Sequence, residues 1–170
     1  FYGLPKRSHG CLSDAKQDDY QSGRESTMVG LSALMCEPEL VYMLAGIMDS
    51  FNTLGYEKFM MDEDTYKICG RFLRGVEFKE ENLYMDKMEK IEHSANYLAR
   101  TSKIYRNDFV FPEIANRKAY SNWKKEDDAI SVQERATLAW KKRLEEYVPL
   151  ELDKKQQKMV EELLPKEWIL

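Results

Sequence analysis

The segment Leu40-Val-Tyr-Met-Leu-Ala-Gly46 is a continuous apolar run with the length of a strand. A run without polar alternation is typical of a strand buried on both faces, as in a parallel sheet. Upstream, Leu4–Gly10 also has the length of a short strand. The intervening segment from Asp18 to about Cys36 predicts a helix, because Asp18 and Asp19 suit a positive helix N-terminus. Residues 1–50 therefore predict a strand–helix–strand unit.

The remainder of the chain is predicted to be helical. Helices are expected at Asp62–Gly75, Glu80–Thr101, from Ser131 to about Tyr147 and from Asp153 onward, with a short helix or turn at Arg117–Trp123. Ser131-Val-Gln-Glu134 has the spacing of a capping box, which marks a helix start.

Composition excludes several classes of protein. The 170 residues are 43% hydrophobic and 33% charged, which suffices for one compact domain. The net charge is −4 and basic residues are dispersed, so nucleic acid is not an expected partner. No apolar segment approaches the roughly 20 residues of a membrane span. Three cysteines without a CxxC pair favour a reducing compartment, and the expected location is cytoplasmic.

The start of the chain predicts a piece of a longer protein. Gly3 is typical of a helix stop that leads into a strand, and the first residue is Phe rather than Met. A domain rarely begins in the last turn of a helix.

One segment carries a family signature. Leu12-Ser-Asp-Ala-Lys16 is followed by Asp19, Gln21, Gly23 and Glu25. This pattern resembles a segment of the trimethylamine:corrinoid methyltransferase family. In the trimethylamine branch of that family, pyrrolysine stands at the position of Leu12. A leucine there, by this resemblance, favours a quaternary amine such as a betaine over trimethylamine. The resemblance continues less strongly through Tyr56–Asp64 and Pro112–Trp123.

The resemblance implies an α/β fold, the C-terminal part of a (β/α)8 TIM barrel. Residues 1–75 would supply the last two strands and their helices, and residues 76–170 a helical C-terminal extension. A complete barrel needs roughly 250 residues, so this chain alone would be mostly helical and inactive. The implied reaction moves a methyl group to the Co(I) corrinoid of a separate corrinoid protein. No cofactor would then bind this chain directly, and a homo-oligomer is expected.

Candidate site residues follow from that expectation, because barrel sites lie at the carboxyl ends of the strands. A methylammonium group favours aromatic faces and carboxylates, and a betaine carboxylate favours cations. The candidates for catalysis are Leu12, Asp14 and Glu25. The candidates for substrate binding are Arg7, His9, Lys16, Tyr20, Gln21, Tyr42, Asp49 and Phe51.

Each candidate has a structural alternative. His9 could be a hydrogen-bonded residue at the end of a strand rather than a ligand contact. Asp14 and Lys16 could pair and hold the loop, and Asp49 could be a cap or turn residue. Glu25 lies four residues after Gln21 on one helix face, either in the site or holding the preceding loop. Cys11 favours a small buried filler over a nucleophile.

Other site classes find no support. His9 and His93 are far apart in the chain, and no Cys/His spacing fits zinc. P-loop and GxGxxG motifs are absent from the sequence. Two hypotheses remain: a quaternary-amine methyltransferase without pyrrolysine, or a non-catalytic C-terminal piece for assembly or corrinoid-protein docking.

Overall fold

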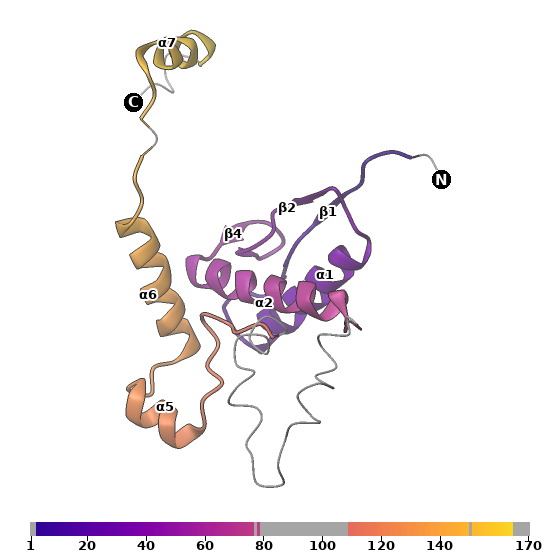
Figure 1. Cartoon of the computed structure of the whole chain (residues 1–170), viewed down its shortest axis with the longest axis vertical. Helices are drawn as coiled ribbons and strands as arrows, with labels where there is room; N and C mark the ends of the chain where they lie inside the picture. Colours follow the sequence, from indigo (N-terminus) through magenta and orange to yellow (C-terminus); the bar gives the residue numbers. More distant parts are fainter. Residues whose placement is uncertain (1–2, 77, 79–108, 150, 165–170) are drawn as a thin grey trace, which may run out of the picture.

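The computed structural model describes residues 3–76, 78, 109–149 and 151–164. This part of the chain is a mixed α/β structure with short strands and longer helices (Figure 1). In chain order its elements are β1 (Arg7–His9), α1 (Tyr20–Met35), β2 (Leu40–Tyr42), β3 (Ile47–Met48), β4 (Thr53–Leu54), α2 (Tyr56–Arg74), α5 (Tyr120–Glu126), α6 (Val132–Glu145) and α7 (Lys154–Leu163). The helices expected within residues 80–101 lie outside the described residues.

The strand–helix–strand unit is confirmed. β1 pairs in parallel with β2, with His9 opposite Tyr42, and α1 forms the connection between them. The side chain of Asp19 caps α1 by accepting a hydrogen bond from the Ser22 backbone N–H at 3.1 Å. The helix begins where the acidic pair predicted it, because an acceptor there satisfies an orphan N–H group.

Both strands are shorter than the sequence predicted, and β2 is also more exposed than predicted. β2 ends at Tyr42, and both Leu40 (57% exposed) and Tyr42 (46% exposed) face solvent. Met43, with φ 51°, takes the chain out of the extended conformation directly after the strand. The expectation of a strand at Leu40–Gly46 buried on both faces was therefore wrong for the described structure.

A small hairpin that the sequence did not predict follows β2. β3 pairs antiparallel with β4. Gly46, with φ +83°, directly precedes β3, and Gly55 directly follows β4. The Gly55 N–H donates to the Gly46 carbonyl at 2.9 Å and closes the hairpin at the point where α2 begins. As a result α2 starts at Tyr56, six residues before the predicted Asp62, and ends as expected at Gly75. Gly55 offers no capping side chain, so no side-chain signal marks the start of this helix.

The core lies where α2 meets the segment before α5 and helix α6. Met60, Ile114 and Ala136 are buried there, and Phe59, Met61, Ala139 and Trp140 pack against them. The predicted capping box of α6 is present, with Ser131 and Glu134 each bonded to the other's backbone N–H. Asp153 caps α7 as predicted, and the short helix α5 begins three residues after the expected Arg117.

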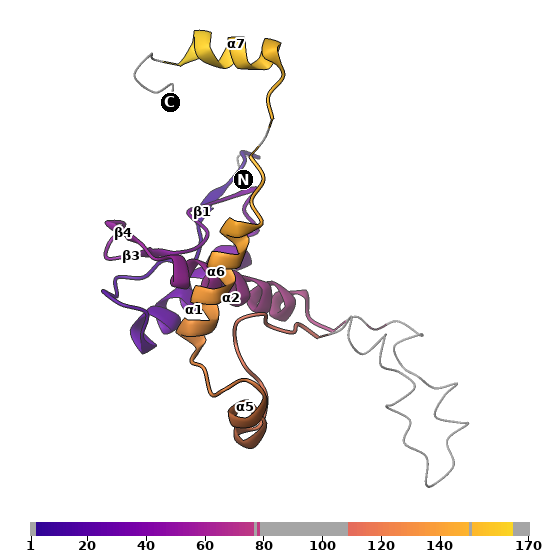
Figure 2. The same ribbon diagram turned by 90° about the vertical axis from the view of Figure 1, so that its left-hand side faces the viewer.

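The helix α7 stands clear of the other described elements (Figures 1 and 2). Among the described residues, no helix is both long and apolar enough to cross a membrane.

Candidate functional site

The loop that follows β1 alternates between two environments. Cys11, Ser13 and Ala15 are almost fully buried, whereas the intervening Leu12, Asp14 and Lys16 are half-buried or exposed. Backbone N–H groups of Cys11 and Ser13 donate to the carbonyls of Leu44 (2.7 Å) and Ile47 (3.2 Å). This extended loop therefore runs along the β2–β3 segment and presents every second side chain to the open side.

Gly10 allows the close approach between these two segments. A Cβ atom at this position would lie 2.4 Å from the Leu44 Cα atom and carbonyl oxygen. Only glycine fits such a contact without backbone movement.

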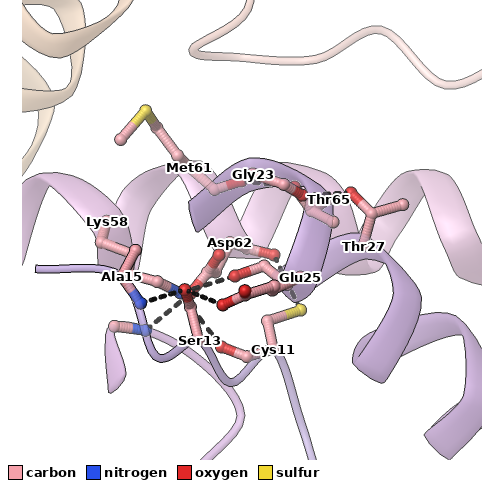
Figure 3. Close-up of polar contacts among 12 residues, drawn as sticks. Cys11, Ser13, Ala15, Gly23, Glu25, Thr27, Lys58, Met61, Asp62 and Thr65 are labelled. Atoms are coloured by element: carbon pink, nitrogen blue, oxygen red, sulfur yellow. Dashed lines mark hydrogen bonds and ion pairs between the residues drawn. The ribbon is translucent and has the colours of Figure 1, made fainter. Parts of the chain in front are cut away.

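A buried ion pair in α2 anchors the same loop from its buried side (Figure 3). The Lys58 ammonium donates to the Cys11 carbonyl at 3.1 Å, to the Ser26 hydroxyl at 2.7 Å, and to the Asp62 carboxylate. The same Asp62 oxygen accepts a bond from the Gly46 backbone N–H at 2.9 Å. Burial raises the pKa of the Asp62 carboxyl, although its partners Lys58 and Gly46 act in the opposite direction. The network joins both strand-end loops and α1 to α2.

Sequence reasoning missed this anchor. The available signal was the spacing of Lys58 and Asp62, four residues apart and therefore on one helix face. The apolar residues Met60 and Met61 lie between them, and only the fold shows that the charged face is turned inward.

Glu25 holds the loop from the side of α1 (Figure 3). Its carboxylate accepts hydrogen bonds from the Ser13 hydroxyl (2.8 Å), the Asp14 backbone N–H (2.9 Å) and the Gln21 amide (2.9 Å). The Ser13 and Asp14 bonds, followed by that of Gln21, lower the pKa of the Glu25 carboxyl. Of the two roles the sequence left open, these contacts favour loop support, with Gln21 orienting Glu25.

The thiol of Cys11, at the start of this loop, is fully buried. Burial is the main reason that its pKa is raised to about 12. The group is therefore a neutral thiol at pH 7, and only the thiolate is a good nucleophile. Cys11 thus fills space in the interior, as the sequence favoured.

A turn with left-handed backbone faces the loop from the β3–β4 hairpin. Asp49, Ser50 and Phe51 have φ values of 49°, 51° and 71°, an uncommon run for residues other than glycine. Asp49 forms an ion pair with Lys16 at 2.7 Å, which raises the pKa of the Lys16 ammonium. The Ser50 hydroxyl donates to the Asp14 carboxylate at 2.9 Å. The strained turn is thus joined to the loop by two side-chain contacts, Asp49 with Lys16 and Ser50 with Asp14.

Aromatic rings and a cation gather at the ends of β1 and β2. The His9 ring packs edge-on against Phe51 and Tyr42, with centroids 5.6 and 5.9 Å apart. The Arg7 guanidinium lies 5.3 Å from the centre of the Tyr42 ring. The His9 Nδ1 atom is buried and has no hydrogen-bond partner within the described part of the chain. We call Arg7, His9, Tyr42 and Phe51 the aromatic cluster.

The structure therefore brings most sequence-predicted residues to one end of the parallel strand pair. Arg7, His9, Tyr42 and Phe51 form the aromatic cluster, Asp14, Lys16 and Asp49 lie around the loop, and Gln21 and Glu25 support it. Leu12 is half-buried in the loop itself. Tyr20, the first residue of α1, is 83% exposed and shares no ring or polar contact with the cluster among the described residues.

A family model described as trimethylamine methyltransferase (MTTB) matches residues 1–167. The chain belongs to this family. It is 35% identical over 90% of its length to a glycine betaine methyltransferase of Desulfitobacterium hafniense. It is 32% identical over 99% of its length to an L-carnitine:corrinoid methyltransferase of Eubacterium limosum. A trimethylamine methyltransferase of Methanosarcina mazei is 32% identical over 72% of this chain.

The chain spans about a third of the length of these betaine and carnitine relatives, 32% and 35% respectively. The similarity to the trimethylamine enzyme covers 25% of that protein.

Proposed function

We propose that this chain is the C-terminal part of a methyltransferase that moves a methyl group from a quaternary amine to the corrinoid of a partner protein. The observation that carries the proposal is the aromatic cluster, which lies at the same strand ends as the Leu12 loop. The longer similarity to glycine betaine and L-carnitine enzymes than to trimethylamine enzymes supports the substrate class.

The complete protein would form a (β/α)8 barrel in which β1 and β2 are the last two strands. Arg7 and His9 of β1 and Leu40 and Tyr42 of β2 share one sheet face by alternation, and this face is partly open to solvent. Further strands would cover this face and enclose the aromatic cluster. Residues 1–75 would then belong to the barrel and residues 76–170 to a helical extension.

The chemistry requires placement of the donor more than activation. A quaternary ammonium departs as a neutral tertiary amine once its methyl group is removed, so no group must make its nitrogen positive first. The partner's corrinoid supplies a strongly nucleophilic Co(I) centre. Leu12 carries no electrophile and would form an apolar wall beside the donor, which is why its place in the family signature favours a quaternary amine.

The aromatic cluster and the carboxylates would bind the two ends of a betaine. An ammonium group over an aromatic face gains about 0.5–2 kcal/mol. The rings of Tyr42 and Phe51 offer such faces, and Asp14 and Asp49 add negative charge nearby. Arg7 and Lys16 are the cations available to a substrate carboxylate.

The test is methylation of cob(I)alamin by the full-length protein, followed by absorbance, with a panel of betaines, carnitine and trimethylamine. We expect turnover with at least one quaternary amine and none with trimethylamine. Turnover of trimethylamine, or silence across the whole panel, would contradict the proposal.

Leu12→Phe tests the pocket wall directly. The larger ring should impair donor binding, whereas Leu12→Met, which conserves volume, should leave kinetics close to wild type. Unchanged kinetics for both variants would show that Leu12 does not line the pocket.

The alternative is a non-catalytic piece that serves assembly or corrinoid-protein docking. The coverage of only a third of the betaine and carnitine relatives keeps it open. A coding sequence that continues upstream of Phe1 into the rest of a barrel would favour the enzyme. A Met codon directly before Phe1 would favour the alternative.

A further inference from the structure

The side-chain alternation of β1 shifts by one residue just before Leu12. His9 packs against the aromatic rings, and regular alternation would place Cys11 on the same side. Instead Cys11 is fully buried, with its Sγ atom 3.9 Å from the Asp62 carbonyl, and Leu12 takes the more open side. The Leu12 N–H donates to the Gly10 carbonyl at 3.0 Å, which closes a three-residue turn at the point of the shift.

This shift places Leu12 on the side of the loop that carries the aromatic cluster. Lys16 alternates with Leu12 along the loop and forms its ion pair with Asp49. Phe51, two residues after Asp49, packs against His9. The direction of the Leu12 side chain therefore depends on how the backbone around it is held.

The peptide planes on both sides of Leu12 are held by hydrogen bonds. In the preceding plane, the Cys11 carbonyl accepts a bond from the Lys58 ammonium at 3.1 Å, and the Leu12 N–H closes the turn just described. In the following plane, the Ser13 N–H donates to the Ile47 carbonyl at 3.2 Å. Fixing both planes fixes φ and ψ of Leu12 and hence the direction of its side chain. Lys58 supplies a side-chain donor to this set, whereas the other two bonds join backbone groups.

The Lys58 ammonium is itself held in place. Its side chain is 1% exposed, and besides the Cys11 carbonyl it binds the Ser26 hydroxyl of α1 at 2.7 Å and the Asp62 carboxylate of α2 (Figure 3). An ammonium group has three donors, so these three acceptors occupy all of them. The position of the Cys11 carbonyl is therefore set by two packed helices.

We propose that Lys58 is a positioning residue for methyl transfer, which directs the Leu12 side chain toward the donor by binding the Cys11 carbonyl. Lys58 does not contact the donor itself, because it lies on the buried side of the loop. The role in methyl transfer rests on the proposed function, whereas the position of Leu12 is a property of the fold and is measurable without turnover.

Methyl NMR of the full-length protein with labelled leucine measures the position of Leu12. Its signal is assigned by its absence from the spectrum of Leu12→Met. Lys58→Met combined with Asp62→Asn removes the donor to the Cys11 carbonyl without leaving an unpaired buried charge. The Leu12 signal should shift or split in this double variant. An unmoved Leu12 signal in the folded double variant would overturn the proposal.

Glu57→Gln is the matched control. It also neutralises a carboxylate of α2, but Glu57 accepts bonds from Thr137 and Trp140 of α6 rather than from the loop, so the Leu12 signal should stay in place. Circular dichroism checks that each variant is folded. Lys58→Gln with Asp62→Asn, which keeps a polar group in the site but on a shorter side chain, is a second form of the same change.

A double-mutant cycle with Leu12→Ala tests the role in the reaction. On the wild-type background, Lys58→Met with Asp62→Asn should lower kcat/KM for the donor roughly 10- to 100-fold, because the donor is misplaced. On the Leu12→Ala background the same change should have little further effect, since the side chain that Lys58 directs is gone. Equal losses on both backgrounds would overturn the proposal, because Lys58 would then act on the fold as a whole. Absence of turnover by the wild type would contradict the proposed function instead, and the NMR result would still decide whether Lys58 positions Leu12.

Discussion

Two lysine–aspartate ion pairs lie at the loop from Cys11 to Lys16, and their environments are opposite. The Lys58–Asp62 pair lies on the buried side of the loop, with side chains only 1% and 5% exposed. The Lys16–Asp49 pair lies on its solvent side, with side chains 69% and 37% exposed. Both ion pairs have a short distance between nitrogen and oxygen, so distance alone does not show which pair contributes more to stability. Burial does, because an unpaired charge in the interior keeps its full desolvation cost and an exposed charge regains water.

The comparison separates support from function. The buried pair binds backbone groups of both strand-end loops and leaves no atom available to a ligand. The exposed pair adjoins the turn that carries Phe51, and water or a substrate carboxylate can compete for its cation. The contacts on the buried side of the loop therefore determine its shape, and the solvent side is accessible for binding.

The largest effect is expected from Lys58→Met. This change leaves the Asp62 carboxylate buried without its cation and should lower the free energy of unfolding by about 3–5 kcal/mol. Urea unfolding followed by circular dichroism measures it. The matched control is Lys67→Met, which removes an exposed ion pair with Glu113 and should cost less than about 1 kcal/mol. Equal losses for the two variants would remove the distinction between buried and exposed pairs.

A smaller effect, on binding rather than stability, is expected from Phe51→Ala in the full-length enzyme. Loss of one aromatic face should raise the KM for the quaternary amine by roughly 3- to 30-fold and leave kcat nearly unchanged. Phe111→Ala is the control, because Phe111 is similarly exposed (56% against 53%) and lies outside the aromatic cluster. If both variants have the same KM as wild type, the aromatic cluster does not contact the donor.

A pH-dependent effect is expected from Glu25. Because hydrogen bonds from Ser13 and Asp14 hold its folded-state pKa below the ordinary value of 4.5, its contribution to stability is complete at neutral pH and is lost as the pH falls below about 4.5. Wild type should thus lose more stability than Glu25→Gln between pH 6 and pH 3.5 in urea unfolding. The exposed Glu37→Gln should follow wild type. Parallel curves for wild type and Glu25→Gln would show that the carboxylate does not support the loop.

The smallest effect is expected from Lys16→Ala. Both members of its ion pair are substantially exposed, so the midpoint of thermal unfolding should stay within error of wild type at 0.15 M salt. A large shift would mean that the ion pair on the solvent side of the loop contributes to stability as the buried pair does.

The sequence predicted the local elements best where a side chain itself supplies the signal. The caps of α1, α6 and α7 at Asp19, Ser131 and Asp153 are confirmed, because each depends on a hydrogen bond within a few residues. The β3–β4 hairpin was missed because its turn uses Asp49, Ser50 and Phe51 in left-handed conformations that nothing in their types requires. The start of α2 was missed for a related reason, since Gly55 has no capping side chain.

The packing face of α1 shows the same limit. Its larger apolar residues in the second half are Val29, Leu31, Leu34 and Met35, whereas the buried residues are Ser22, Ser26, Gly30 and Ala33. Small residues fit this face because α1 lies very close to the loop: a Cβ atom at Gly30 would lie 2.8 Å from the Cys11 Sγ atom. Hydrophobicity carries no information on this distance, and only the fold supplies it.

By itself the sequence determined the strand–helix–strand unit, the caps of three helices, the family, and the candidate residues that meet at the strand ends. These features depend on contacts between neighbours in the chain or on a signature preserved in order. Only the tertiary structure decided that Lys58 and Asp62 face inward, that Glu25 supports the loop, and that β2 is open on one side. These depend on which surfaces meet across long separations in the chain, and burial at such contacts sets the energy of each charge.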